Sequence, residues 1–210
     1  GKEGLMDTID ILRKNNIIPI GAGPHKTAAY KPYIWTHNGS SYGFLAFNNV
    51  GGSIGKAKPK HLTNATGIAW LDEDAMKSVR LLDNVVDHVI VLANWGKEYR
   101  PTPNAKEIKL ANQLIDAGAD IVLGDQAHWV QNHAFIQNKY VAYGLGNFIF
   151  DQSWSERTKE GIIQTLVFYN KELISIDTIP IKLKPGGHIE IVKQAKTHKR
   201  ILTQYYTGQP

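Results

Sequence analysis

The sequence predicts a mixed α/β (α+β) domain, and three features of its hydrophobic pattern carry this prediction. Residues 89–92 form a continuous apolar run, which is typical of a strand buried on both faces of a parallel sheet. Residues 103–117 have the apolar spacing of an amphipathic helix, and a further strand is expected at 121–123, which completes a β-α-β unit. Residues 162–169 and 172–179 are expected to pair as antiparallel strands. A chain with both kinds of strand pairing belongs to the mixed α/β class.

Local signals predict the elements of the N-terminal part. A helix is expected over about 3–15, because apolar residues recur there at helical spacing. The short apolar run at 17–20 is predicted to be a buried strand. Strands at 33–36 and 42–47 flank Asn38-Gly39, a dipeptide that strongly favours the turn of a β-hairpin.

The remaining elements are expected on similar grounds. Residues 48–66 are rich in glycine and lysine and are predicted to form a polar loop. A helix follows at about 72–84, with Asp72 near its N-terminus, where a carboxylate interacts favourably with the helix dipole. Short strands are expected at 133–136 and 140–144.

Composition limits the class of protein. The 210 residues are 42% hydrophobic and 20% charged, as in an ordinary globular domain, and they contain no apolar run long enough to span a membrane. The absence of cysteine excludes disulfides and thiolate metal sites. The net charge of +5 is scattered, and its densest stretch, Lys193 to Arg200, is interpreted as a solvated face. Because no groove-reading motif accompanies that stretch, no nucleic-acid partner is expected.

The start of the chain is unusual for a domain. It opens with Gly1 and enters a helical pattern within a few residues, without an initiator Met, signal peptide or anchor. We therefore expect that residues upstream of Gly1 belong to the intact protein, and that any membrane association comes through that missing segment.

Three polar segments each follow a predicted strand directly. They are residues 94–99 (NWGKEY), 124–128 (GDQAH) and 146–152 (GNFIFDQ). Ligands in open α/β sheets bind beyond the carboxyl ends of the strands, so these segments are expected to surround one cleft. Taken singly, each segment also fits a structural interpretation, in which Asn and Asp form turns and His128 is a structural histidine.

The same segments, with their flanking residues, resemble the signatures of a known family. The stretches ANWGKEY, AGADIVLGDQAHWVQ and YGLGNFIFDQ look like three successive motifs of the CapA family of capsule and poly-γ-glutamate synthesis proteins. The opening GKEGLMDTIDIL resembles the helix that follows an earlier motif of that family. The resemblance covers the chain to about residue 180.

The resemblance implies a fold and a division of the chain. The family domain belongs with the calcineurin-like metallophosphoesterases, so a four-layer αββα sandwich lacking its N-terminal part is expected. Residues 1–180 would be the C-terminal portion of that domain, and residues 181–210 a C-terminal extension. The sheet would then have an exposed edge where the upstream strands belong.

The resemblance also implies metal ligands, from which this chain departs. Three positions at which the family carries histidine ligands hold Asn94, Gln126 and His128, and Asp125 replaces another histidine. Amide oxygens can bind hard cations but are weak ligands for zinc. Divalent Mn, Mg or Zn ions are therefore expected in the intact protein, and this chain alone is expected to lack a two-metal centre. Whether the site is retuned to other metals or has lost metals altogether stays open.

Other matched positions are assigned to chemistry or to the substrate cleft. Glu98 and Asn147 are the predicted catalytic residues: Glu98 would orient a polar group or accept a proton, and Asn147 would meet a substrate oxygen. Their structural alternatives are an ion pair for Glu98 and a turn cap for Asn147. The substrate cleft is predicted to contain Trp95, Tyr99, Asp125 and Asp151, with a role in packing as the alternative for Trp95.

Two functions from different classes follow from these assignments. In the first, the intact protein is a metal-dependent hydrolase or transferase at the cell envelope, acting on a phosphorylated or amide-linked polymer precursor. In the second, the domain is non-catalytic and binds an anionic polymer, such as poly-γ-glutamate or a capsular polysaccharide, during assembly and export. The sequence of this chain does not decide whether the protein is an enzyme.

Overall fold

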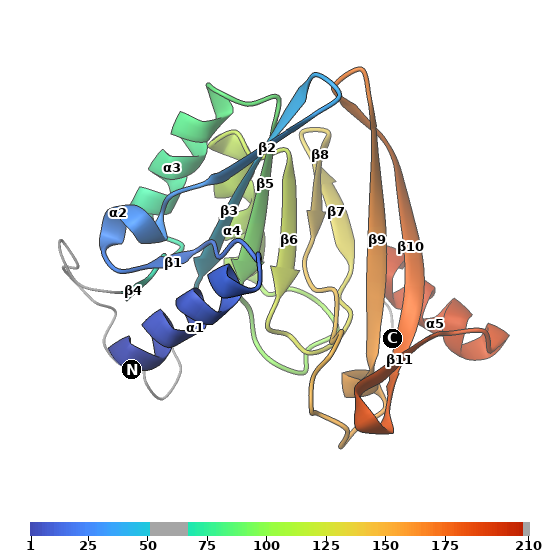
Figure 1. Ribbon diagram of the computed structural model, residues 1–210. Coiled ribbons are helices and arrows are strands. Elements are labelled where there is room, and N and C mark those ends of the chain that lie inside the picture. The colour runs from blue at the N-terminus through green and yellow to red at the C-terminus, as the bar shows by residue number, and fades with distance from the viewer. Residues whose placement is uncertain (51–66, 208–210) are drawn as a thin grey trace. The chain divides into compact units, whose positions relative to one another are not determined.

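The protein is described by a computed structural model that covers residues 1–50 and 67–207 (Figure 1). The chain forms two compact units. The first contains Gly1–Asn94 and Gln113–Val122, and the second contains Trp95–Asn112 and Leu123–Pro210. Helix α4 (Ala105–Asp116) and strand β6 (Ile121–Asp125) contribute residues to both units. Most of the polar loop predicted at 48–66 lies outside the described residues.

The first unit is built on strands in the order β2-β3-β5-β6, which are β2 (Tyr33–His37), β3 (Ser40–Asn48), β5 (His88–Asn94) and the first residues of β6. The predicted hairpin is confirmed: β2 and β3 are antiparallel, and their turn residues Asn38 and Gly39 have φ angles of 49° and 78°. Positive φ at both positions suits the primed turns that match the twist of a hairpin. Strand β5 runs parallel to β3, as expected for an apolar strand within a mixed sheet.

Helices complete the first unit. They are α1 (Lys2–Lys14), α2 (Lys26–Ala29) and α3 (Glu73–Asp83). The predictions of helices near 3–15 and 72–84 are confirmed. Asp72 is the N-cap of α3, because its side chain accepts hydrogen bonds from the backbone N–H groups of Asp74 and Ala75. The short strands β1 (Ala22–Gly23) and β4 (Gly67–Ile68) form a separate antiparallel pair.

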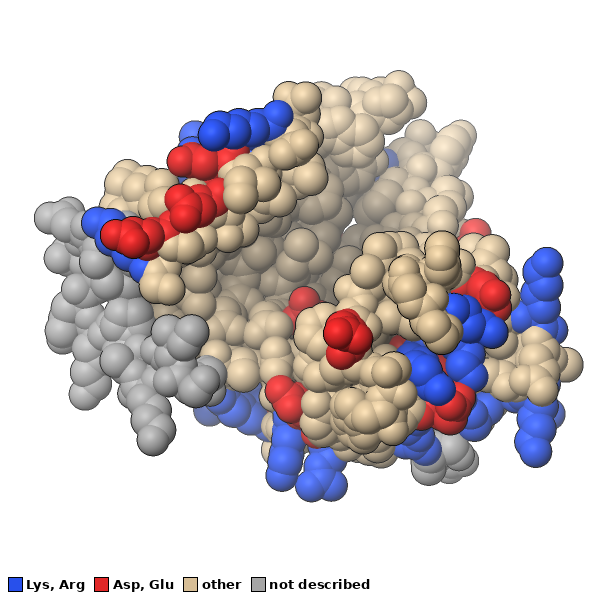
Figure 2. All heavy atoms as spheres, turned by 60° about the horizontal axis from the view of Figure 1, so that its bottom comes forward, with Lys and Arg blue, Asp and Glu red and all other residues tan. Residues whose placement is uncertain are grey.

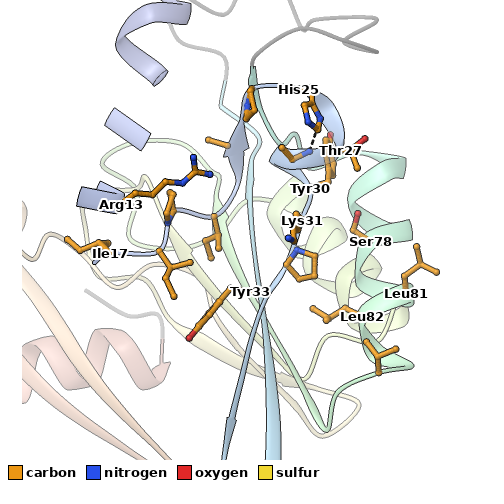
Figure 3. Close-up of a pocket in the computed structure, with 18 of the residues that line it drawn as sticks. Arg13, Ile17, His25, Thr27, Tyr30, Lys31, Tyr33, Ser78, Leu81 and Leu82 are labelled. Carbon is orange, nitrogen blue, oxygen red and sulfur yellow. Dashed lines mark hydrogen bonds between the residues drawn. The ribbon is translucent and has the colours of Figure 1, made fainter. Parts of the chain in front are cut away.

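The strand predicted at 17–20 is wrong. These residues have no regular secondary structure, and Ile17 and Ile18 are each 54% exposed. A strand requires a neighbour to bond its backbone N–H and C=O groups, and no strand of the described residues pairs with this segment. Its apolar side chains instead line a cavity of about 1160 Å³ beside Leu81 and Val85 of the first unit (Figure 3).

The second unit contains a hairpin and a three-stranded antiparallel sheet. The hairpin is formed by β7 (His133–Ile136) and β8 (Lys139–Ala142), and the sheet has the order β11-β10-β9, with β9 (Glu160–Tyr169), β10 (Glu172–Lys184) and β11 (His188–Ile191). The 3-10 turns η1 (Arg157–Lys159) and η2 (Pro185–Gly187) precede β9 and β11, and helix α5 (Ala195–Thr207) ends the unit. These strands confirm the predicted antiparallel pair. Because β10 continues to Lys184, the region 181–210 begins inside a strand.

Helix α4 begins with a reciprocal cap. The side chain of Asn104 accepts from the backbone N–H groups of Lys106 (2.8 Å) and Glu107 (3.1 Å), and Glu107 Oε2 accepts from the N–H of Asn104 (2.9 Å). This pattern is a capping box, and it fixes the chain that leads from β5 into the helix. In the described part of the chain, none of the helices is both long and apolar enough to cross a membrane.

The mixed α/β class predicted from the sequence is therefore confirmed. The four-layer arrangement of two sheets between helices stays a prediction.

Candidate functional site

The centre of the candidate site is a chain of two hydrogen bonds in the second unit. His128 Nδ1 lies 2.9 Å from Asn147 Oδ1, and Asn147 Nδ2 donates to the Thr158 carbonyl oxygen at 2.8 Å. The carbonyl can only accept, so it requires the NH₂ side of the buried Asn147 amide to face it. The amide oxygen therefore faces His128, and His128 Nδ1 carries the proton in this bond.

This arrangement decides what His128 offers to a ligand. When Nδ1 of a neutral imidazole is the donor, Nε2 carries the lone pair. A histidine oriented in this way by a carbonyl-type oxygen is a suitable acceptor for an N–H or O–H donor, and it is also the usual form of a histidine that ligates a metal. The half-buried His128 is thus oriented before any ligand arrives.

Aromatic side chains surround His128. The Tyr99 ring stacks on it with a centroid separation of 5.8 Å, and Phe150 lies at 4.9 Å. The edge of Trp154 contacts Tyr99 at 4.8 Å. We refer to His128, Asn147, Tyr99 and Phe150 as the His128 cluster. Its members come from all three polar segments that follow predicted strands.

A second polar pair lies in the same loops. Gln126 Nε2 donates to Glu98 Oε1 at 3.0 Å, and the backbone N–H of Tyr99 donates to the Ala127 carbonyl at 2.8 Å. These bonds join the loop after β5 to the loop after β6. Tyr99, Gln126 and His128 all have positive φ angles, of 59°, 83° and 57°. Backbone strain of this kind in non-glycine residues is concentrated at functional sites.

The structure thus brings together Glu98, Tyr99, Gln126, His128 and Asn147 among the predicted site residues. Trp95 instead is fully buried in the core, where its Nε1 donates to the Tyr143 carbonyl at 3.0 Å. Gly124 lies against this pair, and an added Cβ would overlap both Trp95 Nε1 and the Tyr143 carbonyl. Trp95 therefore has no surface that a ligand can reach.

Three further predicted site residues are not members of the His128 cluster. Asp125 is exposed at the end of β6, and Asp151 is exposed on the loop that follows Asn147. Asn94 is the last residue of the Gly1–Asn94 segment of the first unit, and its backbone carbonyl accepts from the N–H of Asn49 at 2.7 Å.

The family resemblance implies metal ions, which need a suitable set of ligand side chains. Over residues 1–50 and 67–207, no group of three or more His, Cys, Asp or Glu side chains is placed to hold a metal ion. His128 supplies one imidazole nitrogen, and Gln126 is engaged with Glu98. A two-metal centre needs several anionic or imidazole ligands around both ions. The described residues do not fit such a centre by themselves.

Some residues of the site could not be found from sequence patterns. Thr158 acts through its backbone carbonyl, which any residue would supply, so no sequence signal marks it. Gln152 Nε2 donates to the Tyr99 hydroxyl at 3.1 Å, and only its place in a quoted motif points to it. Glu107 is 2% exposed beside Gly96, and burial raises the pKa of its carboxyl group. The spacing Asn104-x-x-Glu107 is the sequence pattern of a capping box, and it could have pointed to Glu107.

The cavity of about 1160 Å³ in the first unit contains none of the predicted site residues. Apolar side chains such as Ile17, Leu81 and Leu82 line it, and His25 is tied to its own helix by a hydrogen bond from the Ala28 N–H (Figure 3). Burial raises the pKa of Tyr30, another lining residue, whose hydroxyl accepts from the Trp70 N–H. Size therefore does not mark the chemical site in this chain.

Comparison with known proteins gives one family. Residues 1–152 match the family described as "Bacterial capsule synthesis protein PGA_cap". The chain is 31% identical over 206 residues to the PGA biosynthesis protein CapA of Bacillus subtilis (strain 168), covering 97% of this chain and 53% of that protein. It is 29% identical over 190 residues to the capsule biosynthesis protein CapA of Bacillus anthracis, covering 89% and 46%. The chain therefore spans about half the length of the curated relatives it matches.

The similarity of this chain to solved structures is weaker than its similarity to the two CapA proteins. The sulfate thiohydrolase SoxB of Thermus thermophilus aligns with 82% of this chain and 28% of its own, at 13% identity and a TM-score of 0.44.

Proposed function

Because this chain belongs to the family of bacterial capsule synthesis proteins, we propose that the full-length protein acts at the cell envelope in the synthesis of an anionic capsule polymer. Within that role, the His128 cluster binds the polymer or its precursor. We propose poly-γ-glutamate as this polymer, because the relatives named above include a PGA biosynthesis protein.

One observation carries the binding role: the orientation of His128 by Asn147. In the neutral state, Nε2 accepts a hydrogen bond from an amide N–H, and in the protonated state it pairs with a carboxylate. Poly-γ-glutamate carries both groups in each repeating unit. The Tyr99 and Phe150 rings provide apolar walls for the methylene groups between them.

A second function, metal-dependent hydrolysis, is favoured by the same hydrogen bond. Histidine ligands of metals commonly donate their other ring N–H to an oxygen, as His128 donates to Asn147. The donor set of the described residues does not complete a metal site, so ligands from the rest of the full-length protein would be required. Binding is therefore the function that the geometry supports best.

The test is an isothermal calorimetric titration of the full-length protein with poly-γ-glutamate of defined length, which measures the affinity. His128→Ala is expected to weaken binding about tenfold, the loss of one charge-assisted hydrogen bond. His37→Ala is the matched control, because His37 is an exposed histidine of β2 in the first unit, and it should leave the affinity unchanged.

Two outcomes would contradict the proposal. Equal affinity of wild type and His128→Ala would remove the cluster from binding. Shortening of the polymer by the wild type in Mn²⁺ or Zn²⁺, lost in EDTA and in His128→Ala, would establish the hydrolytic function in its place.

A further inference from the structure

A cavity in the second unit carries a concentration of lysines that sequence order does not reveal. It has a volume of about 670 Å³, within the usual range for ligand sites. Lys159, Lys182 and Lys184 line it, together with residues 149–153 and the turn η2. We call it the lysine cavity, and we propose that it binds the carboxylates of an anionic polymer chain. This inference rests on the proposed function and adds to it a second site on the same polymer.

Strand pairing explains why the lysines converge. Lys182 and Lys184 are two residues apart on β10, so their side chains leave the same face of the strand. Lys182 is opposite Glu160 in the antiparallel pairing with β9, and Lys159 immediately precedes that residue. Lysines that are 23 residues or more apart in the sequence (159 against 182 and 184) therefore share one cavity.

An ion pair within the protein shows that these lysines bind a carboxylate group. The side chain of Glu156 lies between two of them: Lys182 Nζ is 2.6 Å from its Oε2, and Lys159 Nζ bonds its Oε1. The two ammonium groups lower the pKa of the Glu156 carboxyl to about 2. Glu156 nevertheless remains 65% exposed, so its ion pairs with the two lysines are accessible to solvent and an incoming carboxylate can displace it.

A chain fits the surroundings better than a single small anion. A neighbouring cavity of about 760 Å³ shares Lys182 and Lys184 and adds Lys193, and in it Lys184 pairs with Glu190 at 3.1 Å. The cationic groups thus extend over two adjacent cavities. Figure 2 shows Lys and Arg side chains gathered closely with Asp and Glu on the right of the view. A polymer with a carboxylate in each unit can contact successive lysines.

The lysine cavity also adjoins the His128 cluster. Phe150 lines the cavity and contacts the His128 ring, and Gln152 lines the cavity and bonds the Tyr99 hydroxyl. The loop 149–153 is therefore a wall of both sites. A polymer held by Lys182 and Lys184 continues along this loop to His128.

The experiment measures the affinity of full-length protein for fluorescent poly-γ-glutamate of defined length, with neutral dextran as the control polymer. The double variant Lys182→Gln/Lys184→Gln is expected to bind about five- to tenfold more weakly, the loss of two partly exposed ion pairs. The matched control Lys77→Gln/Lys109→Gln removes the same charge from exposed helix positions outside the cavity and should stay within about twofold of wild type.

Two further variants test the role of charge at the cavity. Glu156→Gln removes the internal competitor, so the affinity is expected to rise about two- to threefold. Lys182→Arg/Lys184→Arg retains the charge and should retain most of the affinity, which separates loss of charge from loss of folding in the glutamine variant. Thermal unfolding of each variant checks the fold.

The outcomes separate this inference from the proposed function. If His128→Ala weakens binding and the two lysine pairs behave alike, the lysine cavity is not a binding site and the proposed function stands. If wild type binds no poly-γ-glutamate, both fall. The inference would also be overturned if wild type bound dextran as tightly as poly-γ-glutamate. It would likewise be overturned if both Glu156→Gln and Lys182→Gln/Lys184→Gln bound poly-γ-glutamate with the affinity of wild type.

Discussion

At the scale of single residues, the decisive feature is that one histidine is oriented by one amide. The buried Asn147 has the Thr158 carbonyl on one side and His128 on the other, and the chemistry of these partners allows a single arrangement of the amide. Asn147, predicted from the sequence to meet a substrate oxygen, thus makes its structurally visible contact with His128. Its catalytic role remains a prediction.

The tautomer of His128 is directly measurable. In the wild type, we expect a nitrogen NMR spectrum to show that the neutral form of the His128 ring carries its proton on Nδ1. In Asn147→Ala the acceptor is lost, so the population should shift toward the Nε2–H form, and stability should fall by about 1–3 kcal/mol because the Thr158 carbonyl loses its donor. Asn112→Ala, at a partly exposed position of α4, is the control. The same tautomer in both variants would show that Asn147 does not orient the ring.

At the scale of elements, the capping box that begins α4 uses a buried carboxyl group, that of Glu107. Glu107 uses Oε2 for the cap, while its Oε1 is buried against Gly96 and has no hydrogen-bond partner among the described residues. Gly96 has a φ angle of 94°, and an added Cβ would overlap this carboxyl group. The loop that carries Glu98 and Tyr99 is therefore packed directly on the start of the helix.

This arrangement predicts a pH dependence of stability. Burial raises the pKa of Glu107 above its ordinary value of 4.5, so the folded state retains a proton that the unfolded state releases. The contribution of this proton to the free energy of unfolding is complete below the unfolded pKa and is lost as the pH rises through the folded pKa. Glu107→Gln retains an oxygen for the cap and removes the charge. Its melting temperature relative to wild type should therefore rise as the pH increases from acidic to neutral.

The control for this prediction is Glu73→Gln, which replaces an exposed carboxylate in the first turn of α3. It should not reproduce the rise. A difference between Glu107→Gln and wild type that is constant with pH would show that Glu107 has the same proton affinity in the folded and unfolded states.

Elements with local signals were the ones that the sequence predicted well. Asn38-Gly39 specified the β2–β3 turn, and Asp72 and the spacing of apolar residues specified α3. The run at 17–20 failed because apolar composition alone does not supply a partner strand. The signal for a strand is local, whereas the hydrogen bonds that make one are not.

At the scale of the whole molecule, charge is the property that bears on function. The sequence has 24 Lys and Arg against 19 Asp and Glu, which gives the net charge of +5. An excess of this size is modest for a protein that binds a polyanion. The local concentration of lysines at the cavity is therefore a stronger argument than the total charge.

Affinity for the polymer should depend on salt. For wild type, raising NaCl from about 50 mM to about 300 mM is expected to weaken poly-γ-glutamate binding several-fold, because the Debye length shortens and exposed charges are screened more strongly. Lys182→Gln/Lys184→Gln should show a shallower dependence, whereas Lys77→Gln/Lys109→Gln should follow wild type. Affinity that is independent of salt would exclude an electrostatic contribution from the lysines.

The sequence by itself determined the mixed α/β class, most of the elements, the family and the loops that contain the candidate site. These follow from short-range patterns: periodicity, turn dipeptides, caps and contiguous motifs. Only the tertiary structure placed Trp95 in the core, set the proton of His128 through the Thr158 carbonyl, and gathered the lysines into one cavity. Each of these depends on the register of paired strands and on the packing of loops between residues far apart in the chain. Contacts of that kind leave no periodic trace in the sequence.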